Sequence, residues 1–249
     1  MGEFNPFSLK GKTILVTGAS SGIGRAIAIS CSKMGATIIL TARNESRLQE
    51  TLSLLEGTGH TYICADLIDA EDRQVLLSKC TKLDGLVQCA GVGSRVLGKF
   101  VREPDITHVM TPNFTAPVLL QGELLQHGKI NKSASIVYVA SRAAESPSIG
   151  NGVYSASKGA IISYARCLAL ELAPRKIRVN CICPAMVWTD LIIQDGVTKE
   201  MLEEAQQKYP LKRYGQPEDV ANLAIYLLSD ASSWMTGSCV DITGGVNDL

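Results

Sequence analysis

A tyrosine and a lysine lie four residues apart, at Tyr154 and Lys158, in the segment NGVYSASKGAIISYARCLALEL. The spacing of Ala, Leu and Ile in this segment predicts a long helix, on which both side chains share one face. An ammonium beside a phenol favours the deprotonated phenol, so proton transfer becomes feasible at neutral pH. Ser141 follows an apolar run thirteen residues before Tyr154, and its hydroxyl can hold a substrate oxygen. Taken alone, each residue also fits an ordinary role: Tyr154 as an aromatic residue on a helix face, Lys158 as a solvated charge and Ser141 as a turn residue.

Three glycines, Gly18, Gly22 and Gly24, occur in TGASSGIG between a β-branched run and a helical pattern. Glycines let the backbone turn sharply and let a pyrophosphate approach the N–H groups at a helix N-terminus, where the helix dipole favours negative charge. In this context the G-x-x-x-G-x-G spacing indicates a dinucleotide-binding turn rather than a simple tight turn.

The second β-branched run ends in IILTAR, which places Thr41 where NAD-preferring sites usually carry Asp or Glu, and Arg43 two residues later. A guanidinium binds a 2′-phosphate that a carboxylate would repel. We therefore expect NADP(H) as the preferred cofactor, with NAD(H) as an alternative. Two points stay open. Arg43 can instead pair with Glu45 or Glu50 on the surface, and Arg25 either assists cofactor binding or is a solvated residue of the first helical turn.

Strand-like runs alternate with helical patterns along the chain. The expected strands are 13–17, 37–41, 61–65, 86–89, 135–139, 178–183 and 239–242, and the expected helices are 22–34, 45–55, 113–126, 151–172, 199–208 and 217–228. This alternation predicts an α/β fold, a Rossmann-type doubly wound sheet of about seven parallel strands with helices on both faces. We expect a single domain over residues 1–249, with a helical flap at about 187–214 that covers the ligand.

Composition restricts the possible partners and location. Lys plus Arg equals Asp plus Glu at 24 each, so no net field attracts nucleic acid or an anionic membrane. No apolar run has the length of a membrane span or a signal peptide, which predicts a cytoplasmic protein. The three histidines are isolated and no C-x-x-C spacing occurs, so we expect no metal site. Cys181 and Cys183 would point the same way on a strand, which favours two core thiols over a metal or redox pair.

The glycine turn, the YSASK segment and the upstream serine resemble the short-chain dehydrogenase/reductase family over essentially the whole chain. The resemblance implies that Tyr154 is the general acid/base, that Lys158 tunes it, that Ser141 positions the carbonyl and that Asn113 supports a water-linked proton relay. It also implies that Asp66 lies near the adenine and that Pro184 and Thr189 lie near the nicotinamide. Further cofactor contacts are expected at Ser20, Ser21, Ile23, Leu67, Cys89, Ala90, Gly91, Ala185 and Val187.

Three positions depart from the family pattern. The usual N-N-A-G is here Gln88-Cys89-Ala90-Gly91, which replaces an asparagine that braces the central strands, so we expect an altered brace. Pro112 precedes Asn113 and predicts that the helix kinks or starts at the relay residue. The usual Pro-Gly is Pro184-Ala185, which backbone geometry with negative φ tolerates.

The C-terminal segment PLKRYGQPEDVANLAIYLLSDASSWMTGSCVDITGG most resembles the β-ketoacyl-acyl-carrier-protein reductase branch. We therefore expect NADPH-dependent reduction of a carbonyl in a small molecule or an acyl thioester. A basic surface at Arg166, Arg175, Lys176 and Arg178 would suit an acidic carrier. The resemblance also implies a homotetramer. The alternatives are an NAD(P)-linked sugar, polyol or steroid alcohol dehydrogenase, and a non-catalytic cofactor-binding regulator.

Overall fold

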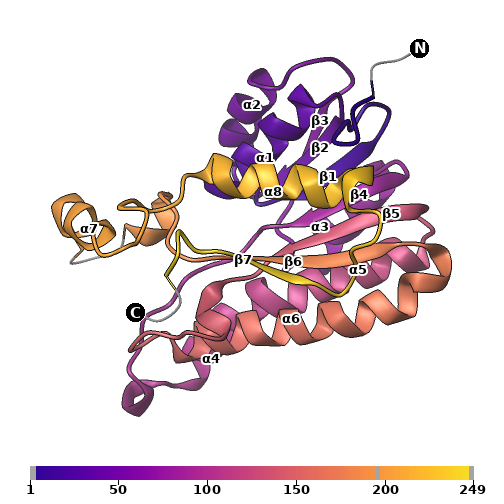
Figure 1. Ribbon diagram of the computed structural model, residues 1–249. Coiled ribbons are helices and arrows are strands. Elements are labelled where there is room, and N and C mark those ends of the chain that lie inside the picture. Colours follow the sequence, from indigo (N-terminus) through magenta and orange to yellow (C-terminus); the bar gives the residue numbers. More distant parts are fainter. Residues whose placement is uncertain (1–3, 194–196, 247–249) are drawn as a thin grey trace.

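A computed structural model describes residues 4–193 and 197–246 of the chain (Figure 1). Seven parallel strands form one sheet in the order β3-β2-β1-β4-β5-β6-β7, which confirms the predicted doubly wound α/β fold. The strands are β1 (Thr13–Thr17), β2 (Thr37–Ala42), β3 (Thr61–Cys64), β4 (Leu83–Gln88), β5 (Ile130–Val139), β6 (Arg178–Pro184) and β7 (Cys239–Ile242). The central strands are buried on both faces, as their continuous apolar runs require.

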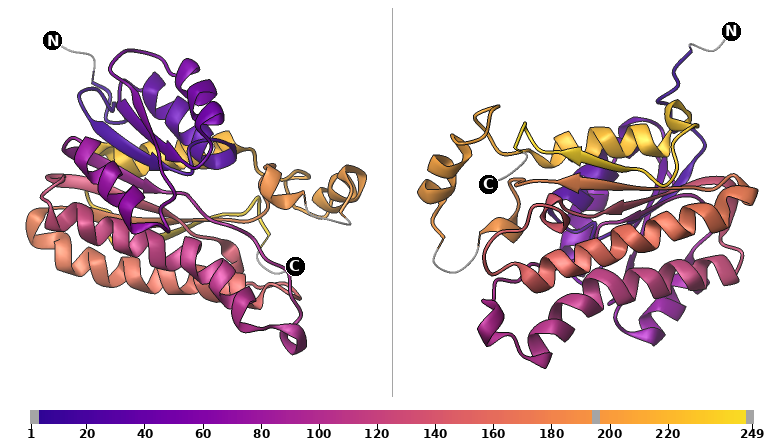
Figure 2. Two further views of the ribbon diagram at one scale, coloured as in Figure 1. Left: turned by 180° about the vertical axis from the view of Figure 1, so that it is seen from behind. Right: turned by 60° about the horizontal axis from the view of Figure 1, so that its bottom comes forward.

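Helices cover both faces of the sheet (Figures 1 and 2). One face carries α1 (Gly22–Lys33), α2 (Glu45–Ser53) and α8 (Pro217–Leu228), whose buried residues join one core cluster. The other face carries α3 (Ala70–Lys79), α5 (Ala116–Gln126) and α6 (Gly152–Leu172), which form the second cluster. Strand order reverses between β1 and β4, and doubly wound sheets bind their ligands in the crevice that this reversal opens.

The helical boundaries differ from the prediction in the middle of the chain. Helix α3 and helix α4 (Glu103–Met110) were not predicted, and the expected helix at 113–126 is the last part of a helical run that starts at Glu103. A π-helical turn over Thr111–Thr115 joins α4 to α5 and contains Pro112. The proline therefore does not start the helix, and the irregularity expected there takes the form of this π turn.

The expected flap at 187–214 projects from the carboxyl ends of the strands, where Figure 1 shows α7 (Lys199–Gln206) well away from the sheet. Of this segment, residues 194–196 lie outside the described residues. The remainder packs around its own small cluster, in which Tyr209 and Tyr214 stack edge to face at 5.0 Å between ring centroids. Among the described helices, none is both long and apolar enough to cross a bilayer.

Candidate active site

A cleft of about 830 Å³ opens at the carboxyl ends of the strands. The glycine turn, the ends of β2 to β6, the start of α6 and the flap all contribute to its walls. Every residue predicted to bind the cofactor lines this cleft: Gly18, Ser20, Ser21, Gly22, Ile23, Gly24, Arg43, Asp66, Leu67, Cys89, Ala90, Gly91, Tyr154, Lys158, Pro184, Ala185, Val187 and Thr189. Ser141 lines it too. Asn113 does not, and is 2% exposed.

The glycine turn has no room for side chains at two of its positions. Gly18 has φ +65°, and a Cβ there would lie 2.9 Å from the Cα of Ala90. A Cβ at Gly24 would lie 2.3 Å from the carbonyl oxygen of Gly18. Real Cβ atoms do not approach backbone so closely, so glycine at position 18 lets the turn pack against Ala90, and glycine at position 24 lets α1 pack against the turn.

The first turn of α1 has backbone donors that no side chain caps. Ser21 is the residue at the N-cap, but its hydroxyl makes no capping bond, and the first turn contains no acidic residue. The free N–H groups and the helix dipole therefore favour an anion at this end of the cleft. Together with the missing side chains of the glycine turn, this donor set fits the pyrophosphate of a dinucleotide.

Thr17, at the end of β1, connects the two strands at the reversal of strand order. Its Oγ1 accepts hydrogen bonds from the backbone N–H groups of Cys89 at 3.0 Å and Ala90 at 3.1 Å. The amide of Gln88 donates to the carbonyl oxygen of Pro117 at 3.1 Å. These bonds hold the end of β4 against β1 and α5. The altered brace expected at Cys89 is thus built from Thr17 and Gln88, and the sequence reasoning did not identify Thr17.

Tyr154 and Lys158 lie one turn apart at the start of α6, as the spacing predicted. The Lys158 Nζ donates to the carbonyl oxygen of Val139 at 2.9 Å and lies 5.7 Å from the centre of the Tyr154 ring. Lys158 is only 7% exposed, so its ammonium is held at the cleft wall by the end of β5. Ser141 Oγ accepts the N–H of Ala143 at 3.1 Å, which leaves its hydroxyl hydrogen to donate elsewhere.

The side-chain amide of Asn113 is fully engaged behind the cleft. It accepts from the Val92 N–H at 2.8 Å and donates to the Val92 carbonyl and to Ser157 Oγ, each at 3.0 Å. A Cβ at Gly91 would lie 2.9 Å from Asn113 Oδ1 and 3.7 Å from Lys158 Nζ, so Gly91 separates these two groups. Pro117 has no N–H, so it cannot make the usual helical bond to the Asn113 carbonyl. Any relay through Asn113 would therefore use its backbone oxygen rather than its amide.

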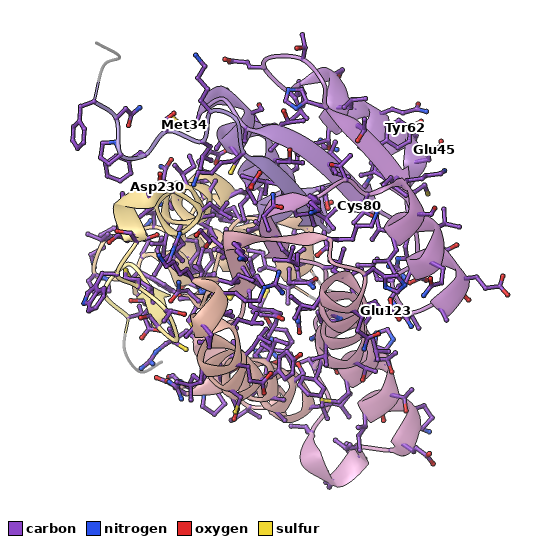
Figure 3. The ribbon with its side chains drawn as sticks, turned by 90° about the vertical axis from the view of Figure 1, so that its right-hand side faces the viewer. Met34, Glu45, Tyr62, Cys80, Glu123 and Asp230 are labelled. Atoms are coloured by element: carbon purple, nitrogen blue, oxygen red, sulfur yellow. The ribbon has the colours of Figure 1, made fainter. Side chains whose placement is uncertain are left out.

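Arg25 and Arg43 have different surroundings. Arg25 pairs with Glu50 at 2.9 Å and donates to the Ser20 carbonyl at 2.7 Å, so it stabilises the glycine turn and does not line the cleft. Glu45 accepts from the Tyr62 hydroxyl at 3.1 Å, and Figure 3 shows these two residues side by side. Within the described part of the chain, the exposed Arg43 guanidinium has no hydrogen-bond or ion-pair partner. Neither surface pairing considered for Arg43 forms.

The other end of the cleft combines polar and apolar walls. Two loops meet there through the Val96 N–H and the Gly150 carbonyl, at 2.8 Å. Across the mouth of the cleft, Arg47 of α2 pairs with Asp190 of the flap at 3.5 Å. Five further lining residues at this end belong to the flap that was expected to cover the ligand: Leu191, Ile192, Val197, Leu202 and Tyr209. The sequence did not predict the cleft position of the remaining ones, Ser94, Arg95, His108, Arg142, Ser146, Ser148, Asn151 and Met186, because no motif connects them.

Two members of the basic group expected to form a carrier surface make hydrogen bonds within the chain itself. Arg175 donates to the Ile130 carbonyl at 2.6 Å, and Arg178 donates to Ser232 Oγ at 2.8 Å and to the Ser229 carbonyl at 3.0 Å. Burial lowers the pKa of Arg178. Both arginines lie near the amino end of β6, whereas the cleft lies at its carboxyl end. These two residues stabilise the fold and do not form a basic patch beside the cleft.

Comparison with known proteins agrees with this architecture. A family model described as enoyl-(acyl-carrier-protein) reductase matches residues 18–247. The chain is 36% identical over 238 residues to the 3-oxoacyl-(acyl-carrier-protein) reductase FabG of Rickettsia felis, covering 96% of this chain and 98% of the relative. A 3-ketoacyl-(acyl-carrier-protein) reductase of Brucella melitensis, solved with NADH, superposes with a TM-score of 0.86 at 30% identity over 96% of this chain and 100% of that one.

A second solved structure carries a different assignment. It is a chain from Beutenbergia cavernae assigned as an NAD(P)-dependent gluconate 5-dehydrogenase, with NADP bound at low occupancy. It superposes with a TM-score of 0.86 at 33% identity, over 97% of this chain and 98% of that one. The fold and the cleft define a dinucleotide-type oxidoreductase. The chain belongs to the short-chain dehydrogenase/reductase family.

Proposed function

We propose that this protein is an NADPH-dependent reductase that converts a carbonyl to an alcohol, with Tyr154 as the general acid. The observation that carries the proposal is that Tyr154, Lys158 and Ser141 line the same cleft as the glycine turn. Reduction needs a bound cofactor and a positioned proton donor in the same cleft. This arrangement provides a place for both.

The cofactor end of the cleft fits a phosphorylated dinucleotide. The uncapped first turn of α1 suits the pyrophosphate, and the unpaired Arg43 suits a 2′-phosphate, which supports NADPH over NADH. Pro184 and Thr189 also line the cleft, and the family resemblance implies that the nicotinamide would lie near them. The chemistry supplied by the bound cofactor is hydride transfer to a carbonyl carbon.

The chain's own residues bind the substrate and move the proton. Ser141 can donate its hydroxyl hydrogen to the carbonyl oxygen, because its oxygen already accepts the Ala143 N–H. Tyr154 donates its phenolic proton to the same oxygen as negative charge develops there. The Lys158 ammonium, fixed by Val139, stabilises the phenolate that Tyr154 becomes. Asn113 holds the loop that starts at Val92 against α6.

For the substrate we propose a 3-ketoacyl thioester first, because the relatives from Rickettsia felis and Brucella melitensis are named as reductases of such substrates. A keto sugar acid is the second candidate, on the basis of the Beutenbergia cavernae structure. The assignments as a single-domain, cytoplasmic homotetramer remain predictions from sequence and family resemblance.

The test is a spectrophotometric assay of NADPH oxidation with an acetoacetyl thioester and with a keto sugar acid. We expect Tyr154→Phe to abolish turnover while NADPH binding, followed by cofactor fluorescence, stays within about twofold of the wild type. Tyr62→Phe is the matched control, because Tyr62 lies outside the cleft and bonds only to surface side chains. Turnover by Tyr154→Phe would reject the assignment. NADPH binding without turnover of any carbonyl would favour the regulatory alternative.

A further inference from the structure

Positive charges outnumber negative charges on the walls of the cleft. The residues that carry a permanent positive charge there are Arg43, Arg47, Arg95, Arg142 and Lys158. Among the described residues that line the cleft, the carboxylates are Asp66 and Asp190. A cleft with an excess of positive charge attracts and concentrates anions. The proposed cofactor is itself an anion and accounts for part of this excess.

Each of these cations except Arg95 already has a partner or a proposed ligand. Arg47 and Arg142 form ion pairs within the chain, and the Lys158 ammonium donates to a backbone carbonyl. Arg43 is the residue proposed to bind the 2′-phosphate. Within the part of the chain that the structure describes, the Arg95 guanidinium has no hydrogen-bond or ion-pair partner. The cofactor therefore leaves one cation of the cleft unexplained.

The aliphatic part of Arg95 packs against the loop that leads into α6. Gly150 has φ +86°, and a Cβ there would lie 3.1 Å from the Cγ of Arg95. The arginine stem thus lies where any larger residue at Gly150 would crowd it. The Val96 N–H donates to the Gly150 carbonyl at 2.8 Å, which holds the two loops together. This packing restricts the Arg95 side chain before a ligand binds, which lowers the entropic cost of binding.

The sheet order places Arg95 away from the residues proposed for the adenine half of the cofactor. Arg43 follows β2 and Asp66 follows β3, both on one side of β1. The loop of Arg95 follows β4 on the other side of β1, and it is bonded to the loop before α6. Arg95 is therefore not a second ligand for the 2′-phosphate expected at Arg43, and Asp66 does not neutralise it.

Arg95 and Tyr154 lie on the same part of the cleft wall. Tyr154 follows Gly150 by four residues, in the first turn of α6, and both Arg95 and Tyr154 line the cleft. One turn of an α-helix rises by only about 5.4 Å. A group bound at Arg95 and a carbonyl bound at Tyr154 can therefore belong to one small molecule.

Neutral hydrogen-bond donors lie on both sides of Gly150. Ser148 and Asn151 line the cleft, and the Asn151 side-chain amide donates to Ser148 Oγ at 2.9 Å. Because the serine oxygen accepts this bond, its hydroxyl hydrogen is left for a ligand. Glu145, in the same loop, does not line the cleft and pairs with Arg142 at 2.6 Å. A guanidinium with neutral donors beside it is an arrangement that binds an anion.

We propose that the substrate carries a carboxylate or a phosphate in addition to its carbonyl, and that Arg95 binds this anionic group. The inference rests on the proposed reductase function, because it assigns the substrate of the same cleft. Both anions present paired oxygens that match the fork of guanidinium donors, so two parallel hydrogen bonds form. Arg95 then selects the substrate by its charge, while Ser141 and Tyr154 bind the carbonyl. Among the candidate substrates, the anion is the carboxylate of a keto sugar acid or the phosphate of a phosphopantetheine thioester.

The first test compares substrate pairs in which one member lacks the charge. One pair is acetoacetyl-pantetheine and its 4′-phosphate, and the other is a keto sugar acid and its methyl ester. In NADPH oxidation, the charged member of one pair should have a kcat/KM at least about tenfold higher than its neutral partner. The pair that shows this preference identifies the anion. Arg95→Ala should lower kcat/KM for that charged member by about tenfold to a hundredfold and leave its neutral partner within about twofold.

Two control variants accompany Arg95→Ala. Arg95→Lys keeps the charge but not the fork of donors, so it should recover only part of the loss. Lys99 follows in the same loop, is exposed and does not line the cleft, so Lys99→Ala should keep the wild-type preference. If Arg95→Ala lowered kcat/KM equally for charged and neutral members, the inference would be wrong, because Arg95 would then hold the loop rather than an anion.

A binding measurement separates this inference from the proposed function. With NADP⁺ in place of NADPH no hydride is available, so calorimetry on the wild type measures the affinity for the carbonyl compound alone. The charged member should bind at least about tenfold more tightly than its neutral partner, and Arg95→Ala should remove the difference. Such a preference without turnover would reject the reductase and keep the anion site. Turnover without a charge preference would keep the reductase and reject the anion site, as would equal or absent binding of the charged members.

Discussion

Lys158 donates its hydrogen bond to the carbonyl oxygen of Val139, at 2.9 Å, from a position that is 7% exposed. The ammonium is therefore fixed by the end of β5 and not by the tyrosine that it faces. Replacement of Lys158 by Met removes the charge but keeps a side chain of similar length. We expect kcat to fall by about a hundredfold to ten-thousandfold, as for loss of a group that assists proton transfer.

The measurement is steady-state NADPH oxidation, with thermal unfolding as the control for folding. If Lys158→Met retained more than about a fifth of wild-type kcat, the charge at this position would not support the chemistry, and Lys158 would serve only to hold β5 against α6.

Arg43 is exposed and, in the described part of the chain, makes no ion pair. Arg43→Ala should weaken NADPH binding by about tenfold to a hundredfold, because hydrogen bonds to a charged group contribute about 1.5–3 kcal/mol. NADH, which lacks the 2′-phosphate, should bind about as before. Arg102→Ala is the matched control, since Arg102 is exposed and does not line the cleft. Equal losses for both cofactors would argue against a 2′-phosphate contact at Arg43.

The Thr17 hydroxyl accepts two backbone N–H groups, from Cys89 and Ala90, at a fully buried position. Thr17→Val keeps the shape of the side chain but leaves both donors without their acceptor. We expect unfolding free energy to fall by about 1–3 kcal/mol and NADPH binding to weaken, because the residues after β4 lose their hydrogen bonds to the end of β1. Urea unfolding measures the first effect. Thr17→Ser keeps the hydroxyl and should restore most of both properties; equal losses in Thr17→Ser and Thr17→Val would show that the hydroxyl does not account for them.

Arg73 and Glu123 form a largely buried ion pair at 3.1 Å, with side chains 6% and 19% exposed. Arg73 also donates to the carbonyls of Leu67 and Ile68, each at 3.0 Å, so it fixes the loop after β3, which lines the cleft. Glu123→Ala should cost about 3–5 kcal/mol of unfolding free energy, because a buried guanidinium loses its counter-charge.

Glu203→Ala is the comparison for Glu123→Ala. Glu203 pairs with Lys199 at 3.5 Å, but both side chains are at least half exposed, and such helix pairs contribute about 0.3–0.5 kcal/mol. Chemical denaturation of both variants should therefore give clearly different losses. Similar losses would mean that solvent reaches the Arg73 pair more freely than its burial indicates.

All seven strands could be predicted from their short runs of β-branched and apolar residues, including β3 and β7, which lie at the edges of the sheet and are only partly buried. The two helices that were not predicted lack an apolar stripe. Helix α4 buries only Val109, and α3 buries Arg73 together with two adjacent leucines, so neither shows the helical period clearly.

That the predicted cofactor-binding residues share one cleft could be anticipated because the glycine turn and the helix that carries Tyr154 are local patterns. The π turn that contains Asn113 depends on packing across α4, α5 and α6, which no local pattern encodes. The pairing of Cys181 with Cys239 depends on strand order and register, so these cysteines were interpreted from sequence as core thiols without regard to each other.

Arg142, the residue after Ser141, pairs with Asp241 of β7 at 3.2 Å, although the two are 99 residues apart in sequence. Contacts between such distant positions form only after a large loop has closed, at an entropic cost that local contacts do not have. The Arg142–Asp241 contact therefore fixes the loop that carries Ser141 late in folding, after β6 has joined the sheet and β7 has paired with β6. Acquisition of activity during refolding should accordingly lag behind formation of the helices.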